Sequence, residues 1–378
     1  MIVINASGVE GGIDYENYLA SYYAGLAVGA STYRGGKPDA AFGGMYYVSG
    51  PEVSFDYEGT DKVTLLNGKE IAYDFIHYGA EFGHGISGEV NKVTFAETTS
   101  ETTTANGTEN GKLINLDAGL VVSGLDVTAE PGAGNVPENE VYSLYSAVRY
   151  GANGEEGQDY IAYLYEVFGS EAQKFIGSDD SDTYTGTAFD DLILGKGGDD
   201  ILAGGDGADT IRGGEGADTL DGGEGDDFVH GGTGDDELSG GAGDDILSGK
   251  NGDDMLFGGE GADRLFGGAG NDTLVGGEGQ DVLFGQGGDD VFLFESATDS
   301  LFESPDRIAD FSDDLIDLQA LGLDFIGEDG FSGEGAEVRL NEVERGTVVL
   351  ADTDGDGVAD FRVIVSGAYD LTESDFLL

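Results

Sequence analysis

The stretch GGEGADTLD at residues 213–221, with GGAGDDILS at 240–248 and GGAGNDTLV at 267–275, decides how this chain folds. These stretches belong to thirteen consecutive nonapeptides, residues 177–293, that keep one phase throughout. Each nonapeptide reads approximately G-G-x-G-x-D-x-U-x, where U is a large apolar residue. A glycine-rich linker would not keep a nine-residue register over such a length, so the segment is predicted to be a structural repeat.

Two positions of the repeat hardly vary: the sixth is always aspartate and the eighth is always apolar. The pattern resembles the calcium-binding repeat of RTX proteins, and that resemblance implies a tight turn of six residues and a strand of three, so that two repeats complete one coil of a parallel β-roll. Glycines supply the positive-φ backbone of stacked turns, and the eighth residues fill a core one side chain thick. Calcium takes about six to eight oxygen ligands, so the aspartates are predicted to bind it. They are Asp182, Asp191, Asp200, Asp209, Asp218, Asp227, Asp236, Asp245, Asp254, Asp263, Asp272, Asp281 and Asp290.

RTX proteins, whose repeat this nonapeptide resembles, are secreted by Gram-negative bacteria. The resemblance implies a β-roll that folds when it binds calcium. Residues 177–293 contain 29 Asp and Glu against four Lys and Arg. We therefore predict that charge repulsion keeps this segment unfolded without metal, because little apolar surface is buried per residue.

Composition narrows the classes of partner. The 378 residues carry a formal net charge of -60, which disfavours nucleic acid and anionic membranes and favours divalent cations. The chain has no cysteine, so disulfides play no part. The opening MIVINASGVEGG lacks the basic and apolar regions of a Sec signal. We expect no membrane span, because no apolar stretch approaches the roughly 20 residues that a spanning helix needs.

Composition changes after the last repeat, and residues 294–378 contain four short motifs and a characteristic terminus. They are ATDS at 297–300, SPDRIADF at 304–311, LIDLQALGL at 315–323, DGDGVADF at 354–361 and the final DFLL. Together they resemble the C-terminal module of serralysin-type proteins. That resemblance implies a β-rich cap and a secretion signal, with a type I ABC transporter as partner and an extracellular or cell-surface location. No H-E-x-x-H pair can be formed from the three histidines, so we expect no protease and no enzyme.

Asp352, Asp354 and Asp356 resemble the opening of an EF-hand loop. The twelfth residue of that loop would be Val363 instead of the bidentate glutamate. Two interpretations therefore stay open for this segment, an Asp-rich β-hairpin turn and an additional calcium site.

Residues 1–172 are predicted to form an α+β domain. An amphipathic helix is expected at 15–27, antiparallel strands follow, and two helices are expected between 137 and 170. The order Y-x-x-Y-L, G-G-M-Y-Y, G-K-E-I-A-Y and H-G-I-S-G-E-V-N-K-V-T-F resembles the HasA-type hemophore, a secreted heme-capture domain. The resemblance implies ferric heme as cofactor and an outer-membrane heme receptor as partner.

The family holds heme between two loops, with a tyrosine phenolate on the iron and a histidine supporting it. Carried over to this sequence, the tyrosine is Tyr73 and the histidine is His84. Because the spacing between them is longer than in the family, His77 is an alternative partner for Tyr73. The first loop, predicted at 29–42, contains no histidine, and Tyr33 is its only strong iron ligand.

Three functions compete on these grounds. The first is an extracellular heme-binding protein with a calcium-dependent β-roll. The second is a structural or matrix protein that self-assembles through a hemophore-like module without heme. The third is an RTX enzyme, although the sequence offers no nucleophile–base pair.

Overall fold

The computed structural model describes residues 171–378 except 369, together with the backbone of the strands between residues 2 and 129. The chain divides into two compact units, Met1–Ser178 and Asp179–Leu378, which are described separately. The helices predicted at 15–27 and between 137 and 170 lie outside the described residues. Within the described part, no helix is long and apolar enough to cross a bilayer.

The first unit contains an antiparallel sheet in the order β2-β4-β5-β6-β9-β1, and β10 pairs parallel with β1. Its strands are β1 (Ile2–Asn5), β2 (Val28–Arg34), β3 (Pro38–Asp39), β4 (Tyr47–Tyr57), β5 (Lys62–Asp74), β6 (Gly85–Thr98), β9 (Leu116–Ala129) and β10 (Gln173–Ile176), with a small hairpin of β7 (Thr108–Glu109) and β8 (Lys112–Leu113). The register of β5 shifts against both neighbours, and such bulges bend strands.

Residues 29–34 and 38–39 form strands, whereas the sequence predicted a loop over 29–42. This range includes most of β2 and all of β3, and both strands pair with β4. Tyr33 is therefore a strand residue whose backbone lies opposite Val53. A strand is physically reasonable here because Thr32 and Tyr33 are both strand-favouring residues and β4 supplies backbone hydrogen-bond partners.

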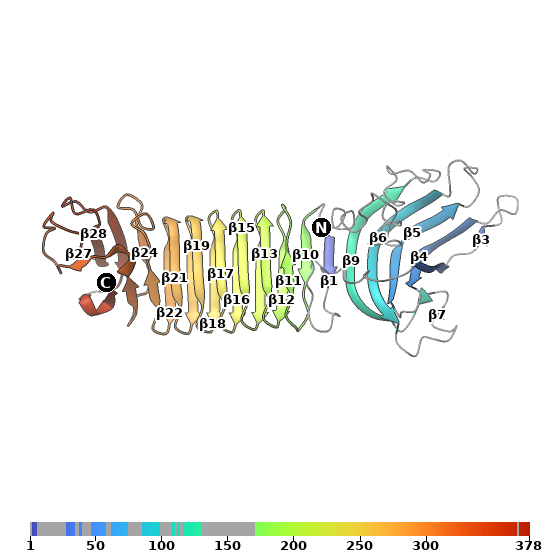
Figure 1. Ribbon diagram of the computed structural model, residues 1–378, viewed down its shortest axis with the longest axis horizontal. Coiled ribbons are helices and arrows are strands. Elements are labelled where there is room, and N and C mark those ends of the chain that lie inside the picture. Colours follow the sequence, from blue (N-terminus) through green and yellow to red (C-terminus); the bar gives the residue numbers. More distant parts are fainter. Residues whose placement is uncertain are drawn as a thin grey trace. The chain divides into compact units, whose positions relative to one another are not determined.

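The second unit begins with the β-roll, whose strands alternate between two parallel sheets (Figure 1). Each strand pairs with the strand 18 residues further on, so two repeats form one coil, as predicted. The strands are β11 (Thr183–Thr185), β12 (Leu192–Gly197), β13 (Ile201–Asp206), β14 (Thr210–Glu215), β15 (Thr219–Glu224), β16 (Phe228–Thr233), β17 (Glu237–Ala242), β18 (Ile246–Asn251), β19 (Met255–Gly261), β20 (Arg264–Ala269), β21 (Thr273–Gly279), β22 (Val282–Gly287) and β23 (Val291–Leu293).

Most of these strands are longer than the three residues predicted. They span six residues because pairing continues through the two glycines that follow, as Gly214 opposite Gly232 illustrates. Gly232 has φ +137°, and a Cβ there would lie 2.1 Å from the carbonyl oxygen of Gly214. Only glycine lets successive backbones approach this closely.

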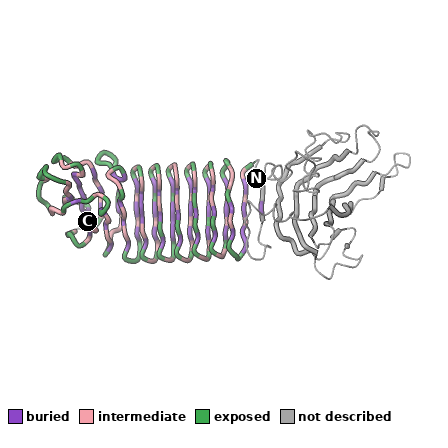
Figure 2. Tube along the Cα trace, in the orientation of Figure 1, coloured by how far each residue is buried: buried purple, intermediate pink, exposed green. Residues whose placement is uncertain are grey.

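The core of the roll is a single file of eighth-position side chains. These residues, from Tyr184 through Leu238 to Phe292, are at most 1% exposed. Figure 2 shows the resulting alternation of buried and exposed residues along every coil. Each coil therefore buries about two large side chains between its sheets, and its apolar stabilisation is correspondingly small.

The cap extends both sheets and covers their end. One sheet continues through β24 (Asp306–Ile308) to β29 (Phe361–Ser366), and the other continues through β25 (Leu315–Asp317) to β30 (Phe376–Leu377). The remaining elements are β26 (Asp324–Phe325), β27 (Glu337–Val343), β28 (Gly346–Asp352) and two short 3₁₀ turns, η3 (Gln319–Leu321) and η4 (Glu373–Asp375). Strands β27, β28 and β29 pair antiparallel.

Candidate metal sites along the β-roll

The sixth-position aspartates form two columns along the roll. In each column, Oδ1 of one aspartate accepts a hydrogen bond from the backbone N–H of the aspartate 18 residues earlier. Asp218 donates to Asp236 at 2.9 Å, and Asp236 donates to Asp254 at 2.8 Å. The thirteen aspartates are at most 4% exposed. Stacking of coils thus brings together carboxylates that are far apart in the sequence.

The second carboxylate oxygen lacks a hydrogen-bond partner in most of the column. This Oδ2 atom is buried and unpaired in a set of eleven aspartates within the described residues. They are Asp200, Asp209, Asp218, Asp227, Asp236, Asp245, Asp254, Asp263, Asp272, Asp281 and Asp306. A buried carboxylate oxygen without a donor is costly unless a cation compensates it.

Carbonyl oxygens face the same space as these Oδ2 atoms. A Cβ built on Gly222 would lie 2.4 Å from Oδ2 of Asp227 and 2.4 Å from the carbonyl oxygen of Gly240. The first glycine of the repeat therefore keeps a small oxygen-lined space open. Hard oxygen donors of mixed carboxylate and carbonyl type are what calcium prefers, so the residues fit that ion.

The pKa values of the buried aspartates also fit a cation site. Burial, with a smaller contribution from repulsion by neighbouring aspartates, raises the pKa of Asp227 and of Asp236 from 3.8 to about 7. Burial, together with repulsion from Asp281, raises the pKa of Asp306 to about 8. Without a cation, these groups therefore hold protons at a pH where ordinary aspartates have lost them.

We expect the effect of pH to be opposite with and without calcium. Because the folded pKa values exceed the unfolded value, the metal-free roll should lose stability as pH rises from about 4 to about 7. Calcium needs the deprotonated carboxylates, so its affinity should rise over the same window. Calcium titrations followed by circular dichroism should give a midpoint at least tenfold higher at about pH 5 than at about pH 7.5. A midpoint that is unchanged between those pH values would contradict this assignment of the buried carboxylates.

The cap adds two aspartates that the repeat pattern did not reveal. Asp306 accepts the N–H of Asp281 at 2.8 Å, and Asp314 accepts that of Asp290 at 3.1 Å. They lie 25 and 24 residues after their donors, so a search with the nonapeptide period misses them. A signal was nevertheless present, because Asp306 and Asp314 are each followed two residues later by a buried isoleucine, like the sixth and eighth repeat positions.

The segment with Asp352, Asp354 and Asp356 is the connection between β28 and β29. Carboxylate oxygens of these residues lie within 4.8 Å of one another. Asp352 already accepts N–H groups of its own loop, from Gly355 at 2.8 Å and from Gly357 at 2.7 Å. Val363 lies in β29 and is buried, so this segment does not continue as a twelve-residue EF-hand loop.

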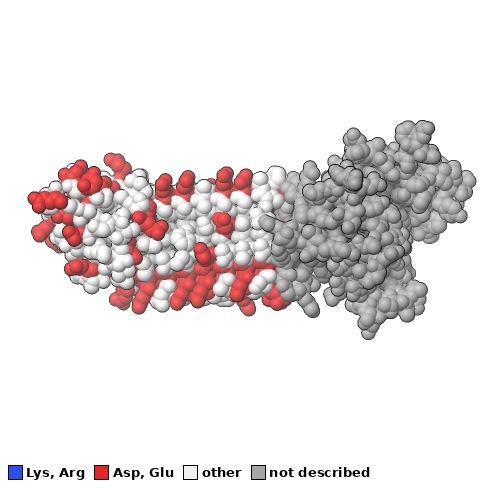
Figure 3. All heavy atoms as spheres, in the orientation of Figure 1, with Lys and Arg blue, Asp and Glu red and all other residues white. Residues whose placement is uncertain are grey.

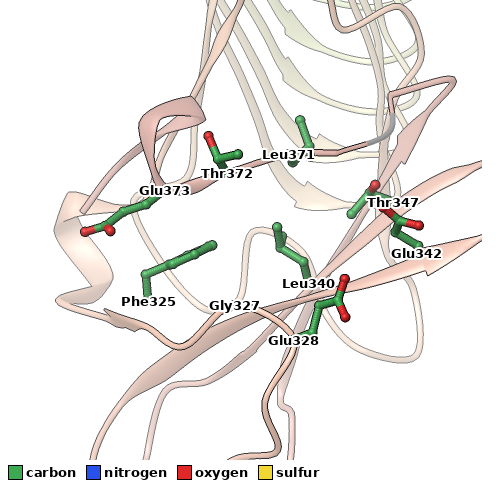
Figure 4. A pocket seen from close by; sticks show the side chains of 9 residues that line it. All are labelled: Phe325, Gly327, Glu328, Leu340, Glu342, Thr347, Leu371, Thr372 and Glu373. Atoms are coloured by element: carbon green, nitrogen blue, oxygen red, sulfur yellow. The ribbon is translucent and has the colours of Figure 1, made fainter.

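A cavity of about 200 Å³ lies in the cap (Figure 4), and no aspartate of the two columns lines it. Phe325, Leu340 and Leu371 form its apolar part. Its polar lining consists of glutamates and threonines. This lining has no histidine, cysteine, lysine or arginine, so it provides no nucleophile–base pair and no counter-charge for an anion.

The residues predicted to bind heme fall in the first unit. Tyr73 lies in β5, where its backbone is opposite Val48 of β4 and Ile86 of β6. His77 and His84 lie outside the described residues. The structure describes no side chain for Tyr33 or Tyr73.

Comparison with protein families identifies two parts of the chain. Residues 263–378 match the family described as "Peptidase M10 serralysin C terminal". The family "RTX calcium-binding nonapeptide repeat (4 copies)" matches five overlapping stretches, 176–211, 194–229, 204–238, 221–256 and 239–274. No curated protein sequence matches the chain.

Solved structures that are similar to the chain include the apo hemophore HasA of Yersinia pestis. That similarity has 13% identity and a TM-score of 0.28, and covers 44% of this chain and 88% of the hemophore. The holo form of the same hemophore gives 13% identity, a TM-score of 0.26 and the same coverage. A subunit of the mannuronan C5-epimerase of Azotobacter vinelandii is 24% identical with a TM-score of 0.15, covering 53% of this chain and 80% of that subunit.

The chain thus combines RTX calcium-binding repeats with a serralysin-type C-terminal module. These two parts define a calcium-binding protein of the type I secretion class, located outside the cell. The serralysin-type module is consistent with export through a type I ABC transporter. The matched parts form a structural β-roll and its cap, not a catalytic domain.

Proposed function

We propose that this protein is an extracellular heme-binding protein whose β-roll folds on calcium after type I secretion. The roll would cross the transporter as an unfolded chain and fold where calcium is abundant. Metal binding to the folded state alone would then favour its outward movement, because ligation shifts the folding equilibrium. The secreted domain would capture ferric heme and deliver it to an outer-membrane heme receptor.

The unpaired Oδ2 atoms are the observation that supports calcium binding by the aspartate columns. In this proposal, each ion is held by sixth-position aspartates and by backbone carbonyls of the adjoining glycine-rich turns. The thirteen repeat aspartates are the proposed ligands, and Asp306 continues one column into the cap. The hairpin carboxylates of Asp352, Asp354 and Asp356 are proposed as an additional site.

Replacing Asp236 by Asn should weaken calcium binding to the roll. The amide keeps the shape of the side chain but removes the charge from a buried oxygen that lacks a donor. We expect the calcium midpoint of folding to rise by about threefold to tenfold, since one ligand of a multi-site array is changed. Asp235→Asn is the matched control, because Asp235 also accepts a backbone N–H, from Asp253 at 3.0 Å, but at an exposed position. Equal shifts in the two variants would argue against Asp236 as a ligand.

Heme binding by the first unit is supported by the sequence resemblance around Tyr73 and His84. A phenolate is a hard anionic ligand for ferric iron, and an imidazole that accepts its hydrogen bond promotes ionisation of the hydroxyl. In this proposal Tyr73 ligates the iron and His84 supports it, with His77 as the alternative partner. Tyr33, which lies in β2, is proposed as a further heme contact.

A ferric heme titration of the calcium-folded chain tests this part. We expect a saturable one-to-one Soret change with a tyrosinate charge-transfer band, and at least a tenfold loss of affinity in Tyr73→Phe. Tyr57→Phe, in β4, is the control for a general effect of removing a hydroxyl. His84→Ala and His77→Ala identify which imidazole supports Tyr73. If no saturable spectrum is seen and calcium produces polymers visible by electron microscopy, the self-assembling matrix protein becomes the better interpretation.

A further inference from the structure

The two sheets of the roll present different charges to solvent. Among the described strands, β12 to β22 of one sheet carry four basic side chains and one acidic side chain. Strands β11 to β23 of the other sheet carry six acidic side chains and no basic one. Every Lys and Arg of residues 177–293 therefore lies in a single sheet.

We call the outward surface of this sheet, from β12 to β24, the basic face. Its cations are all exposed, and Arg307 of the cap continues the series beyond the repeats. They are Lys196, Arg212, Lys250, Arg264 and Arg307. Seven strands spaced at about 4.8 Å make the face roughly 29 Å long. His230 lies between Arg212 and Lys250, and its pKa is lowered first by burial and then by these two cations.

Parallel register places aromatic rings among these cations. Phe266 pairs with Phe284, and their rings stack at 4.8 Å with an interplanar angle of 10°. The guanidinium of Arg264 lies 5.7 Å from the centre of the Phe266 ring. The face therefore offers flat apolar rings next to exposed cations, a combination that neither the acidic sheet nor the turns provide.

The backbone of the basic face is unusual as well. Lys196, Lys250 and Gln286 have φ values of 87°, 88° and 70°, at the second repeat position where glycine is usual. In strands β13 to β21 of the opposite sheet, that position is glycine every time. A left-handed conformation disfavours residues with a Cβ, so these three long polar side chains stand where the backbone conformation favours glycine. Such outliers point to a function of the side chains.

The surroundings of the face restrict what could occupy it. The whole chain has a net charge of -60, and acidic side chains gather along both edges of the roll (Figure 3). These edges repel a broad polyanionic surface such as duplex nucleic acid or an anionic bilayer. A narrow extended polyanion can run between them, with its carboxylates on the cations and its apolar C–H groups against the Phe266 and Phe284 rings. We propose that the basic face binds a linear acidic polysaccharide extended along the stacked coils.

Fluorescently labelled hyaluronan oligosaccharide is a suitable probe, because it carries a carboxylate on every second sugar. Anisotropy of the calcium-loaded full chain should show saturable binding that weakens as salt is raised toward about 0.5 M. An equally long neutral dextran should not bind. The double variant Arg212→Gln with Arg264→Gln should bind about tenfold more weakly, as expected for two exposed ion pairs.

The matched control places the same charge change on the opposite sheet. Ser239→Glu with Thr273→Glu alters one ninth-position and one seventh-position residue, as the arginine variant does, and also lowers the net charge by two. We expect less than about a twofold loss for this control. Equal calcium midpoints by circular dichroism show that both variants fold.

Four results would overturn the proposal. They are no saturable binding of the probe, equal binding of dextran, equal losses in both double variants, or self-association of the wild type that only the arginine variant loses. The last result would assign the basic face to a second copy of the chain. Arginine-dependent binding to vesicles containing phosphatidylserine, with no binding of hyaluronan, would assign it to a membrane.

Discussion

Chelation of calcium with EGTA at neutral pH is expected to unfold the β-roll of the intact protein. Eleven buried carboxylate oxygens lack a hydrogen-bond donor in the described part, and the core is only one side chain thick. A metal site contributes about 2.7 kcal/mol when calcium is one hundred times its Kd, and several sites add. The summed contribution of several sites is as large as the marginal free energy of unfolding of most domains, so removing calcium should unfold the roll.

Circular dichroism and limited proteolysis measure this loss directly. The β-sheet signal from the roll should disappear in EGTA and return on adding calcium. Magnesium is the control ion, because it demands octahedral geometry and retains its waters, so it should not restore the fold. A protease-resistant roll in EGTA would contradict a calcium-dependent fold.

Leu247→Asp is expected to be the most damaging single substitution in the roll. Leu247 is 0% exposed and lies in the single file of core side chains, where a carboxylate would have no partner. The free energy of unfolding should fall by more than about 4 kcal/mol, as is typical when an unpaired charge is buried. Because every coil contacts only its neighbours, the loss should also uncouple the coils on either side.

Ile246→Asp is the matched control for this change. Ile246 precedes Leu247 in β18 but faces outward and is 36% exposed, so its substitution should cost no more than about 1 kcal/mol. Calcium-dependent folding of both variants can be compared by urea titration at saturating calcium. Similar free energies of unfolding for the two variants would mean that the eighth-position side chains do not form the core.

Much of the roll could be predicted because its repeat is local and strict. Asp218 and Leu220 occupy equivalent positions in every coil, so one repeat defines their burial and their neighbours 18 residues away. Strand length could not be predicted as well, because the pairing of Gly214 with Gly232 depends on a neighbouring coil and not on local propensity. Within the loop expected at 29–42, residues 29–34 and 38–39 form strands, since β4 supplies pairing partners that the local sequence does not reveal.

Tertiary structure alone decided three further features. It joined Asp306 and Asp314 to the aspartate columns, because six or seven extra residues in the cap are accommodated without interrupting the stacking of strands. It paired β30 with β25, so that the C-terminal residues end one sheet. It also placed Arg212 and Arg264 on the same surface, because alternate repeats enter the same sheet.

The amino-acid sequence by itself determined the coil, its buried residues and the oxygen chemistry of its metal sites. Each of these depends on a nine-residue pattern that repeats too often to allow another register. The distribution of charge between two sheets and the extension of the columns into the cap depend on which strands become neighbours. That choice is made when coils stack, since stacking alone pairs backbone groups and carboxylates that lie 18 or more residues apart.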